Sequence, residues 1–138
     1  MQYSVISNLL LSLWLFQLSF AHQDCVKVVG KVVCKKDQRR VLNTEVNVID
    51  RDGTGWLDWI DRDDLMGLSW PEHDGSFSVE GCAGDHDWVP FYKNRPEPFV
   101  LIRHYCNEPI HGQELILPEF DVFRPFVFEI KEPIVLDD

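Results

Sequence analysis

Alternation between apolar and polar residues is the most regular pattern in this chain, and it begins near residue 25. In residues 26–34, Val26, Val28 and Val32 fall on one face, whereas Lys27 and Lys31 fall on the other. This alternation predicts a half-buried β-strand, because successive side chains of a strand point to opposite faces. The same criterion predicts about seven strands, at residues 26–34, 44–49, 65–70, 76–80, 99–106, 114–117 and 126–130.

The segments within and between these strands add detail. Residues 99–102 are all apolar, which predicts a strand covered on both faces. The charged residues 35–40 predict a turn, and the His-Asp-Gly sequence at 73–75 predicts a tight turn of the hairpin type. Residues 56–60 have one helical spacing of apolar side chains, so a short helical turn is expected there. Short strands joined by turns predict an all-β fold of two packed sheets.

The beginning of the chain has the layout of a secretory signal. Residues 1–21 carry no acidic or basic side chain, contain an apolar core at residues 9–16, and place small residues at Ser19 and Ala21. This layout predicts a signal peptide over residues 1–21 and one mature domain over residues 22–138. A membrane anchor is the alternative, but a spanning helix needs about 20 predominantly apolar residues, and polar residues interrupt this segment. We therefore expect a secreted, extracellular protein with no transmembrane segment.

All four cysteines lie in the predicted mature domain, at Cys25, Cys34, Cys82 and Cys106. An even number of cysteines in a small secreted chain predicts two disulfides, and the spacing alone leaves their connectivity open. Zinc binding is the alternative, but no pair of cysteines or histidines has the close spacing of zinc ligands.

The net charge of −10 narrows the partners that we expect. A nucleic acid is not expected, because phosphate binding needs concentrated Lys and Arg. The charge is uneven: residues 27–40 hold six basic side chains and one acidic one, whereas residues 50–87 hold eleven acidic and two basic ones. The basic turn at residues 35–40 is a candidate contact for an anionic glycan or lipid headgroup, although charged turns usually serve solubility.

The order and spacing of several sequence blocks match a known family. The most specific are residues 74–82, an Asp-Gly turn leading to Gly-Cys, and residues 98–107, a strand ending in His-Tyr-Cys-Asn. Three earlier blocks precede them, at residues 29–34, 46–52 and 63–67. Over residues 26–130 the chain therefore resembles the nematode transthyretin-like proteins.

This resemblance implies a two-sheet transthyretin-like (prealbumin-like) β-sandwich of about seven strands. It also implies the disulfides Cys25–Cys82 and Cys34–Cys106. In that topology the first strand lies antiparallel beside strand 76–80, and its far end lies level with the end of strand 99–106. The family is secreted and mostly without an assigned molecular activity, so the resemblance implies location and fold more than function.

The sharpest local motif is the acidic stretch at residues 50–61. Laid on the calcium loop of an EF-hand, it places Gly55 at the turn and oxygen-bearing side chains at ligand positions. These candidate metal ligands are Asp50, Asp52, Thr54, Asp58 and Asp61. A true EF-hand is not expected, because the preceding residues alternate like a strand and the last ligand is Asp in place of Glu. A weak Ca²⁺ loop and a solvated acidic loop are both compatible with the pattern, and no other cofactor is expected.

Aromatic residues outside the cores of the predicted strands provide candidate binding residues. They are Trp56, Trp59, Trp88 and Tyr92, accompanied by Trp70 and Phe91. Exposed tryptophans are enriched at binding hot spots. The alternative is that these residues cap the open ends of the sandwich.

The sequence shows no catalytic constellation. The cysteines are assigned to disulfides, the Gly-x-Ser-x-Gly motif is absent, and the histidines form no close pair. His104 lies within a predicted strand, where a structural hydrogen bond is the expected role. The hydroxyisourate hydrolases, an enzyme branch related to this fold, end in Tyr-Arg-Gly-Ser, whereas this chain ends at residues 134–138 with Ile-Val-Leu-Asp-Asp. A hydrolase of that type is a remote alternative, and we expect a protein that is not an enzyme.

The leading hypothesis is a secreted, non-catalytic binding module of transthyretin-like type. Its expected partner is an extracellular protein, a lipid or a small apolar ligand, recognised through the Trp-rich and acidic loops. The main alternative is calcium-dependent adhesion or surface docking through residues 50–61.

Overall fold

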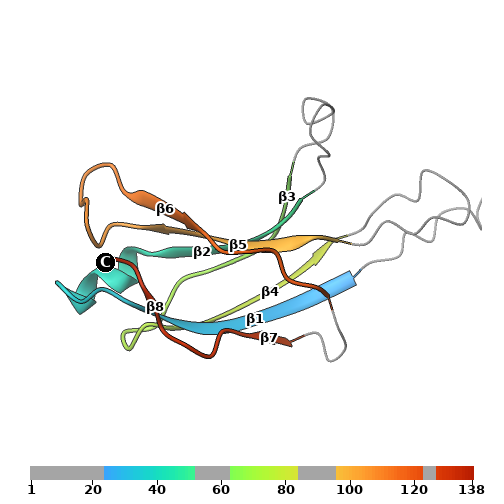
Figure 1. Ribbon diagram of the computed structural model, residues 1–138, viewed down its shortest axis with the longest axis horizontal. Coiled ribbons are helices and arrows are strands. Elements are labelled where there is room, and N and C mark those ends of the chain that lie inside the picture. Colours follow the sequence, from blue (N-terminus) through green and yellow to red (C-terminus); the bar gives the residue numbers. More distant parts are fainter. Residues whose placement is uncertain (1–23, 52–62, 84–95, 123–126) are drawn as a thin grey trace, which may run out of the picture.

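Two four-stranded β-sheets lie one above the other and make up the fold (Figure 1). The computed structural model describes residues 24–51, 63–83, 96–122 and 127–138. The elements are β1 (Asp24–Val33), the 3-10 helix η2 (Gln38–Asn43), β2 (Glu45–Asp50), β3 (Asp64–Ser69), β4 (Ser76–Ala83), β5 (Pro98–His104), β6 (Gln113–Ile116), β7 (Val127–Glu129) and β8 (Ile134–Val135). Two sheets with almost no helix confirm the expected all-β sandwich.

Strand β1 is the centre of the first sheet, in which the order is β4-β1-β7 and β8 also pairs with β1. β4 lies antiparallel to β1, with Cys25 opposite Cys82. The other edge of β1 is shared, because β7 pairs in parallel with residues 27–29 and β8 with residues 32 and 33. β1 therefore has hydrogen-bonded neighbours on both edges. The short strand β8 was not predicted from the sequence.

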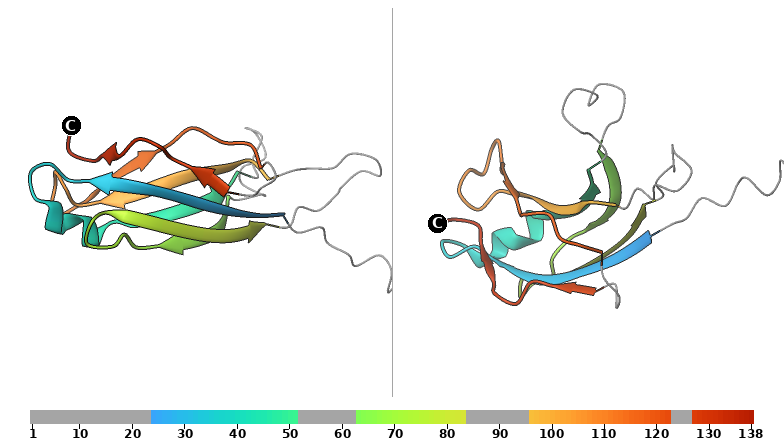
Figure 2. Two further views of the ribbon diagram at one scale, coloured as in Figure 1. Left: turned by 90° about the horizontal axis from the view of Figure 1, so that it is seen from below. Right: turned by 45° about the vertical axis from the view of Figure 1, so that its right-hand side comes forward.

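The second sheet has the order β3-β2-β5-β6, and all its pairings are antiparallel. The β2–β3 pairing shifts register between Val48 and Ile49, which pair with Gly67 and Leu65, so Met66 is the extra residue of a bulge in β3. Figure 2 shows the same two layers from two further directions.

Alternate residues of both sheets fill the space between them. Val28 and Val32 of β1, Val46 and Val48 of β2 and Ile102 of β5 have no exposed surface. The four valines occupy inward positions that the alternating pattern predicts, and Ile102 belongs to the apolar run at residues 99–102. The other core residues include Val26, Cys34, Val41, Met66, Phe77, Val79, Val100 and Cys106.

The apolar run at residues 99–102 is covered on both faces only in part. Its two inward residues are fully buried, and Phe99, on the outer face, is also buried. Phe99 is covered because the guanidinium of Arg51 lies over its ring, 4.8 Å from the centroid. Leu101, the next outward residue, is partly buried. The expectation of a strand covered on both faces is therefore met at Phe99, Val100 and Ile102 and only in part at Leu101.

The charged turn after β1 contains a helical segment that the pattern did not predict. Asp37 caps η2 by accepting a hydrogen bond from the backbone amide of Arg39 at 3.2 Å. Val41 is the buried residue of this 6-residue helix and has no exposed surface. One buried position in a single short segment produces no periodicity, so no helical pattern can be recognised there.

Residues 73–75 belong to a tight turn, but the strands on either side of it lie in different sheets. The amide of Gly75 donates to the carbonyl of Glu72 at 2.9 Å, which closes the turn. β3 nevertheless pairs with β2, whereas β4 pairs with β1. The expectation of a hairpin is wrong here, because the turn carries the chain from one sheet to the other.

The backbones of β3 and β4 approach each other closely at the side of the sandwich. A Cβ atom added at Gly67 would lie 2.3 Å from the carbonyl oxygen of Glu80. One added at Gly81 would lie 2.4 Å from the carbonyl oxygen of Met66. Only glycine fits at both positions, so these residues allow an edge of one sheet to close against an edge of the other.

Two disulfides fasten the ends of β1. Cys25–Cys82 joins residues that face each other on β1 and β4. Cys34–Cys106 joins the residue after β1 to the segment after β5, and so it links the two sheets. This is the pairing that the family resemblance implied. The bridges span 57 and 72 residues of sequence, for which the chain-entropy model gives about 4 kcal/mol each.

Replacing Gly75 by alanine is expected to lower the free energy of unfolding by about 1–3 kcal/mol. Gly75 has φ of +86°, and an added Cβ would lie 2.0 Å from the carbonyl oxygen of Val32. Urea unfolding followed by circular dichroism measures the loss. The control Ser78→Ala, at an exposed position of β4, should change the free energy of unfolding by less than about 0.5 kcal/mol. Equal stability of the two variants would contradict this account of the turn.

Candidate functional site

Most of the candidate residues chosen from the sequence lie outside the described part of the chain. Of the proposed metal ligands, only Asp50 is described. Outside the described residues lie Asp52, Thr54, Asp58 and Asp61, together with the aromatic residues Trp56, Trp59, Trp88 and Tyr92. Their roles stay predictions. Among the residues that the structure describes, no group of three or more His, Cys, Asp or Glu is placed to hold a metal ion.

Asp50 has a structural contact at the end of β2. It is 1% exposed, and one oxygen of its carboxylate accepts a hydrogen bond from the amide of Glu97 at 2.8 Å. The amide of Arg51 in turn donates to the carbonyl of Glu97. Asp50 thus ties the end of β2 to the segment that enters β5. Replacing it would disturb the fold as well as any calcium site.

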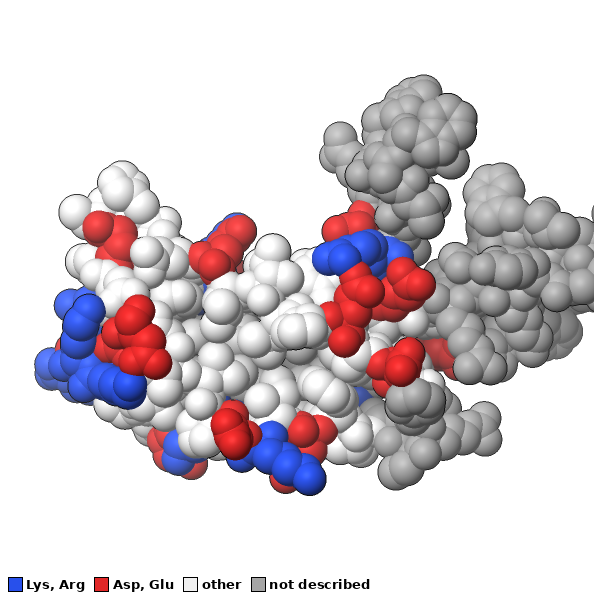
Figure 3. All heavy atoms as spheres, in the orientation of Figure 1, with Lys and Arg blue, Asp and Glu red and all other residues white. Residues whose placement is uncertain are grey.

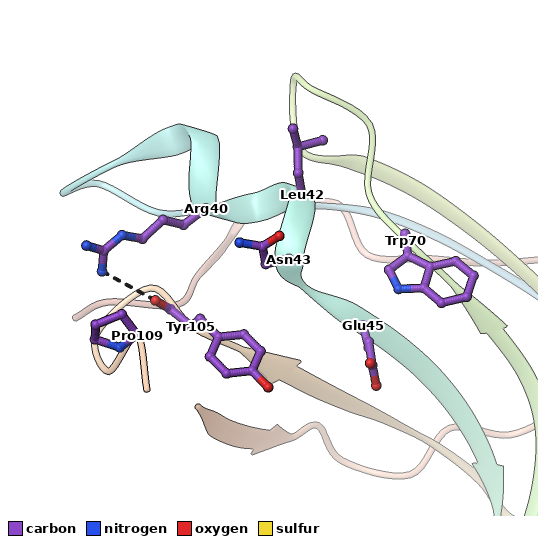
Figure 4. A pocket seen from close by; sticks show the side chains of 7 residues that line it. All are labelled: Arg40, Leu42, Asn43, Glu45, Trp70, Tyr105 and Pro109. Carbon is purple, nitrogen blue, oxygen red and sulfur yellow. Dashed lines mark hydrogen bonds between the residues drawn. The ribbon is translucent and has the colours of Figure 1, made fainter. Parts of the chain in front are cut away.

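A surface hollow of about 450 Å³ lies at the end of the sandwich that carries η2, and we call it the end hollow. Its lining comes from η2 and the start of β2 (Arg40, Leu42, Asn43, Glu45), from the end of β3 (Trp70), and from the segment after β5 (Tyr105, Pro109). Figure 4 shows Trp70 on one side and Arg40 and Pro109 on the other, with Glu45 and Tyr105 between them. Its volume falls within the range of ligand pockets, roughly 300–1,000 Å³.

Two large apolar side chains of the end hollow remain in contact with water. Trp70 is 58% exposed and Leu42 is 39% exposed. Such exposure forgoes the stabilisation from apolar burial, about 25 cal/mol for each Å². A partner that covers these side chains would recover that free energy. Exposed tryptophans of this kind are enriched among binding hot spots.

Two arginines at and beside the end hollow are oriented by hydrogen bonds within the protein. Nη1 of Arg40 donates to the carbonyl oxygens of Cys106 at 3.1 Å and Tyr105 at 3.4 Å (Figure 4). On β5, Arg103 donates to Glu114 through Nε at 3.1 Å and Nη2 at 2.6 Å. The hydrogen bond from Arg103 to Glu114 raises the pKa of Arg103. Preorientation lowers the entropy that these side chains lose when a ligand binds.

The basic turn at residues 35–40 has acidic partners within the protein. Lys35 pairs with Asp138, and Arg39 pairs with Asp37. Lys and Arg side chains still gather at the end of the molecule that carries η2 (Figure 3). These ion pairs weaken the hypothesis of an anionic ligand at the turn, because an anion would have to compete with the existing carboxylates.

Asp137 fixes the turn that leads into η2. It is 6% exposed, and its carboxylate accepts hydrogen bonds from the backbone amides of Lys36 at 2.7 Å and Lys35 at 2.8 Å. The bond from Lys36 is the main reason that the pKa of Asp137 lies below its ordinary value. With the neighbouring Cys34–Cys106 disulfide, this contact holds η2 against the end of β5. The wall of the end hollow is therefore anchored on both sides.

Two buried polar side chains lie beneath this end of the sandwich. His104 is 4% exposed and Thr44 is fully buried, and neither His104 Nδ1 nor Thr44 Oγ1 has a hydrogen-bond partner among the described residues. The structural hydrogen bond expected of His104 is thus not found at Nδ1. Burial lowers the pKa of His104, while the charge of Asp137 opposes this shift. The imidazole is therefore neutral at neutral pH, and its burial keeps it from acting as a general base on a substrate at the surface.

The sequence identified only part of the end hollow. The sequence indicates Trp70 as an aromatic residue that accompanies the candidate binding residues, and it indicates Arg40 as part of a basic turn. It missed Leu42, Glu45 and Tyr105, which are close to Trp70 only in the folded chain. The one available signal was Leu42, an apolar residue that belongs to no alternating strand.

A β-sandwich stapled by two disulfides, with an open hollow at one end, defines this chain as a small all-β module. Comparison with known proteins gives the family, because the model of the Transthyretin-like family matches residues 29–117. The chain belongs to the transthyretin-like family. No helix in the described part of the chain is long and apolar enough to span a membrane.

Two individual matches accompany the family match. Transthyretin-like protein 16 of Caenorhabditis elegans is 32% identical over 82 residues, which are 59% of this chain and 51% of that protein. The chain thus spans about half the length of this relative. A crystal structure of a 9R-lipoxygenase from Cyanothece PCC8801 has a TM-score of 0.47 and 16% identity, covering 83% of this chain and 16% of that one. A likeness at that level carries no argument about fold or function.

Asp137→Asn is expected to destabilise the protein at neutral pH, and the difference from wild type should disappear in acid. The pKa of Asp137 in the folded state lies below its ordinary value of 3.8. Its contribution is therefore complete above that value and is lost as the pH falls through the lower, folded-state pKa. Urea unfolding midpoints of both proteins at about pH 7, 5 and 2.5 measure the effect. The control Asp121→Asn, at an exposed position, should match wild type throughout. A constant difference down to the lowest pH would contradict the assignment.

The alternative hypothesis of weak Ca²⁺ binding at residues 50–61 is tested by calorimetric titration of oxidised residues 22–138. That hypothesis requires a dissociation constant on the order of 10⁻⁴ to 10⁻³ M, the range of extracellular modules. Because Asp50 has a structural contact, the diagnostic variant is Asp52→Asn combined with Asp58→Asn, and it should abolish binding. Asp64→Asn, exposed at the start of β3, is the matched control. A flat titration of the wild type at several times that concentration would refute calcium binding.

Proposed function

We propose that this chain is a secreted, non-catalytic binding module of the transthyretin-like family that holds an extracellular ligand in the end hollow. The observation that carries the proposal is the exposure of Trp70, 58%, on the wall of a hollow large enough for a ligand. Leu42 adds a second exposed apolar contact, and Arg40 and Glu45 add hydrogen-bonding groups. Apolar surface with a few placed polar groups is the usual composition of a binding site.

The anchoring of the end hollow supports binding. Its walls are joined by the Cys34–Cys106 disulfide and by the hydrogen bonds that Asp137 accepts from the turn before η2. A site built on covalent and hydrogen-bonded supports loses little conformational entropy when it is occupied. The ligand is then recognised by a surface that exists before it arrives.

A role in binding agrees with the chemistry of the residues that could react. All four cysteines are in disulfides, so none offers a thiolate nucleophile. His104 is buried and neutral. These facts support a non-catalytic module over a hydrolase.

Secretion is supported by the beginning of the chain and by the disulfides. Residues 1–21 have the composition of a signal peptide, which leaves residues 22–138 as the mature domain. Disulfides persist in oxidising compartments outside the cytosol. We therefore place the mature domain in the extracellular space.

Trp70→Ala is expected to weaken ligand binding at least about tenfold, because hot-spot aromatics contribute about 2 kcal/mol or more and 1.4 kcal/mol is about tenfold. Oxidised wild type and variant are screened against arrays of extracellular proteins, phospholipids and glycans, and every hit is titrated by surface plasmon resonance. Leu65→Ala, which also removes an exposed apolar side chain but lies outside the end hollow, should bind like wild type. Wild-type affinity of Trp70→Ala for every ligand found would refute the end hollow as the site.

A further inference from the structure

The end hollow is the middle one of three hollows that share aromatic walls. Trp70 also lines a hollow of about 350 Å³ beside the start of β4. Tyr105 also lines a hollow of about 400 Å³ beside the connection from β5 to β6. The three are therefore contiguous, and the two aromatic residues form the ridges between them. We call the combined lining of the three hollows the rim band.

The rim band crosses the strands of the second sheet instead of following one edge. Glu45 of β2 lies opposite Arg103 of β5, and Arg103 lies opposite Glu114 of β6. Trp70 follows Ser69, which lies opposite Val46, the neighbour of Glu45. A peptide that extends a sheet binds along a strand edge through its main chain. A ligand in the rim band would instead be held by side chains, and it would run across the strands of the sheet.

Basic and acidic side chains balance in two of the three hollows, whereas the hollow beside β4 adds Glu72 and no basic side chain, so the rim band as a whole has no excess of positive charge. In the end hollow Arg40 stands with Glu45, and in the hollow beside β6 Arg103 is hydrogen-bonded to Glu114. Neither hollow therefore offers an excess of positive charge for a phosphate or sulfate group, or of negative charge for a cation. The guanidinium groups of Arg40 and Arg103 are oriented by hydrogen bonds, and Glu45 and Glu114 add carboxylate acceptors, which suits a ligand rich in neutral hydroxyl and amide groups.

We propose that the rim band binds a neutral linear oligosaccharide, with sugar rings seated in successive hollows against Trp70 and Tyr105. The flat, partly apolar faces of the sugar rings lie on the aromatic side chains, whose bodies are apolar and whose edges are polar. The sugar hydroxyl groups exchange hydrogen bonds with Arg40, Glu45 and the Arg103–Glu114 pair. The proposal rests on the proposed function, because it names the class of ligand for the same site.

Three contiguous hollows predict a dependence on chain length. Isothermal titration of oxidised residues 22–138 uses cellotetraose and chitotetraose as probes, with the corresponding disaccharides as comparison. We expect at least one tetrasaccharide to bind at least about tenfold more tightly than its disaccharide, because linked contacts raise the effective concentration at the next hollow. Trp70→Ala should weaken tetrasaccharide binding about tenfold or more, whereas Trp70→Phe, which keeps a ring, should retain most of it. Leu65→Ala is the matched surface control, and thermal unfolding of each variant verifies the fold.

The salt dependence tests the neutral charge of the ligand. Affinity for a neutral oligosaccharide should change less than about twofold between 0.05 and 0.5 M NaCl, because screening acts on charged partners. A steep loss with salt, together with a preference for heparin-derived tetrasaccharides, would overturn the neutral ligand class.

The outcomes separate this inference from the proposed function. If no tetrasaccharide binds, but another ligand from the array screen loses affinity in Trp70→Ala, the oligosaccharide is refuted and the binding site stands. If a tetrasaccharide binds equally to wild type and Trp70→Ala, the rim band is refuted as its site. If no ligand of any class depends on Trp70, both proposals fail.

Discussion

Strand β1 has hydrogen-bonded neighbours on both edges, and its inward valines are among the least exposed residues of the core. Its two ends are also fixed covalently, by Cys25 to β4 and by Cys34 to the segment after β5. The first sheet is therefore organised around β1, and the second sheet is attached to it through Cys106 and through the shared core. A change that displaced β1 would at once remove pairing with β4, β7 and β8.

The position of the end hollow depends on how β1 is fixed, and a series of neighbouring contacts connects the two. β1 ends at Cys34, the turn after it is held by Asp137, and η2 then presents Arg40 and Leu42 at the surface. Arg40 completes this series of contacts, because its guanidinium donates a hydrogen bond to the carbonyl of Cys106, which is disulfide-bonded to Cys34. The position of the end hollow thus depends on the same disulfide that joins the two sheets.

The strands and the core could be predicted from the sequence, because side chains on alternate sides of a strand leave a repeated signal. Val28, Val32, Val46 and Val48 were placed correctly on this basis alone. η2 and β8 were missed because a six-residue helix and a two-residue strand are too short to repeat any pattern. The end hollow was mostly missed for another reason: its residues come from three separate segments, and their proximity is set by the packing of the sheets. Asp50 shows the same limit, since its spacing suits a calcium ligand while its buried contact with Glu97 is a property of the folded chain.

The close approach of β3 and β4 at Gly67 and Gly81 bears on whether another molecule can pair with the edges of the sheets. A strand edge with free N–H and C=O groups is a template on which another molecule can add a strand, and so begin a fibril. Because the two edges shield each other here, neither has room for an incoming chain. β7 and β8 end the first sheet on its other side and β6 ends the second sheet, so in the described part of the chain these three short strands have outer edges that no strand covers. Protection against edge-to-edge pairing therefore rests on the two glycines at one side and on the shortness of the remaining edge strands, which have four, three and two residues.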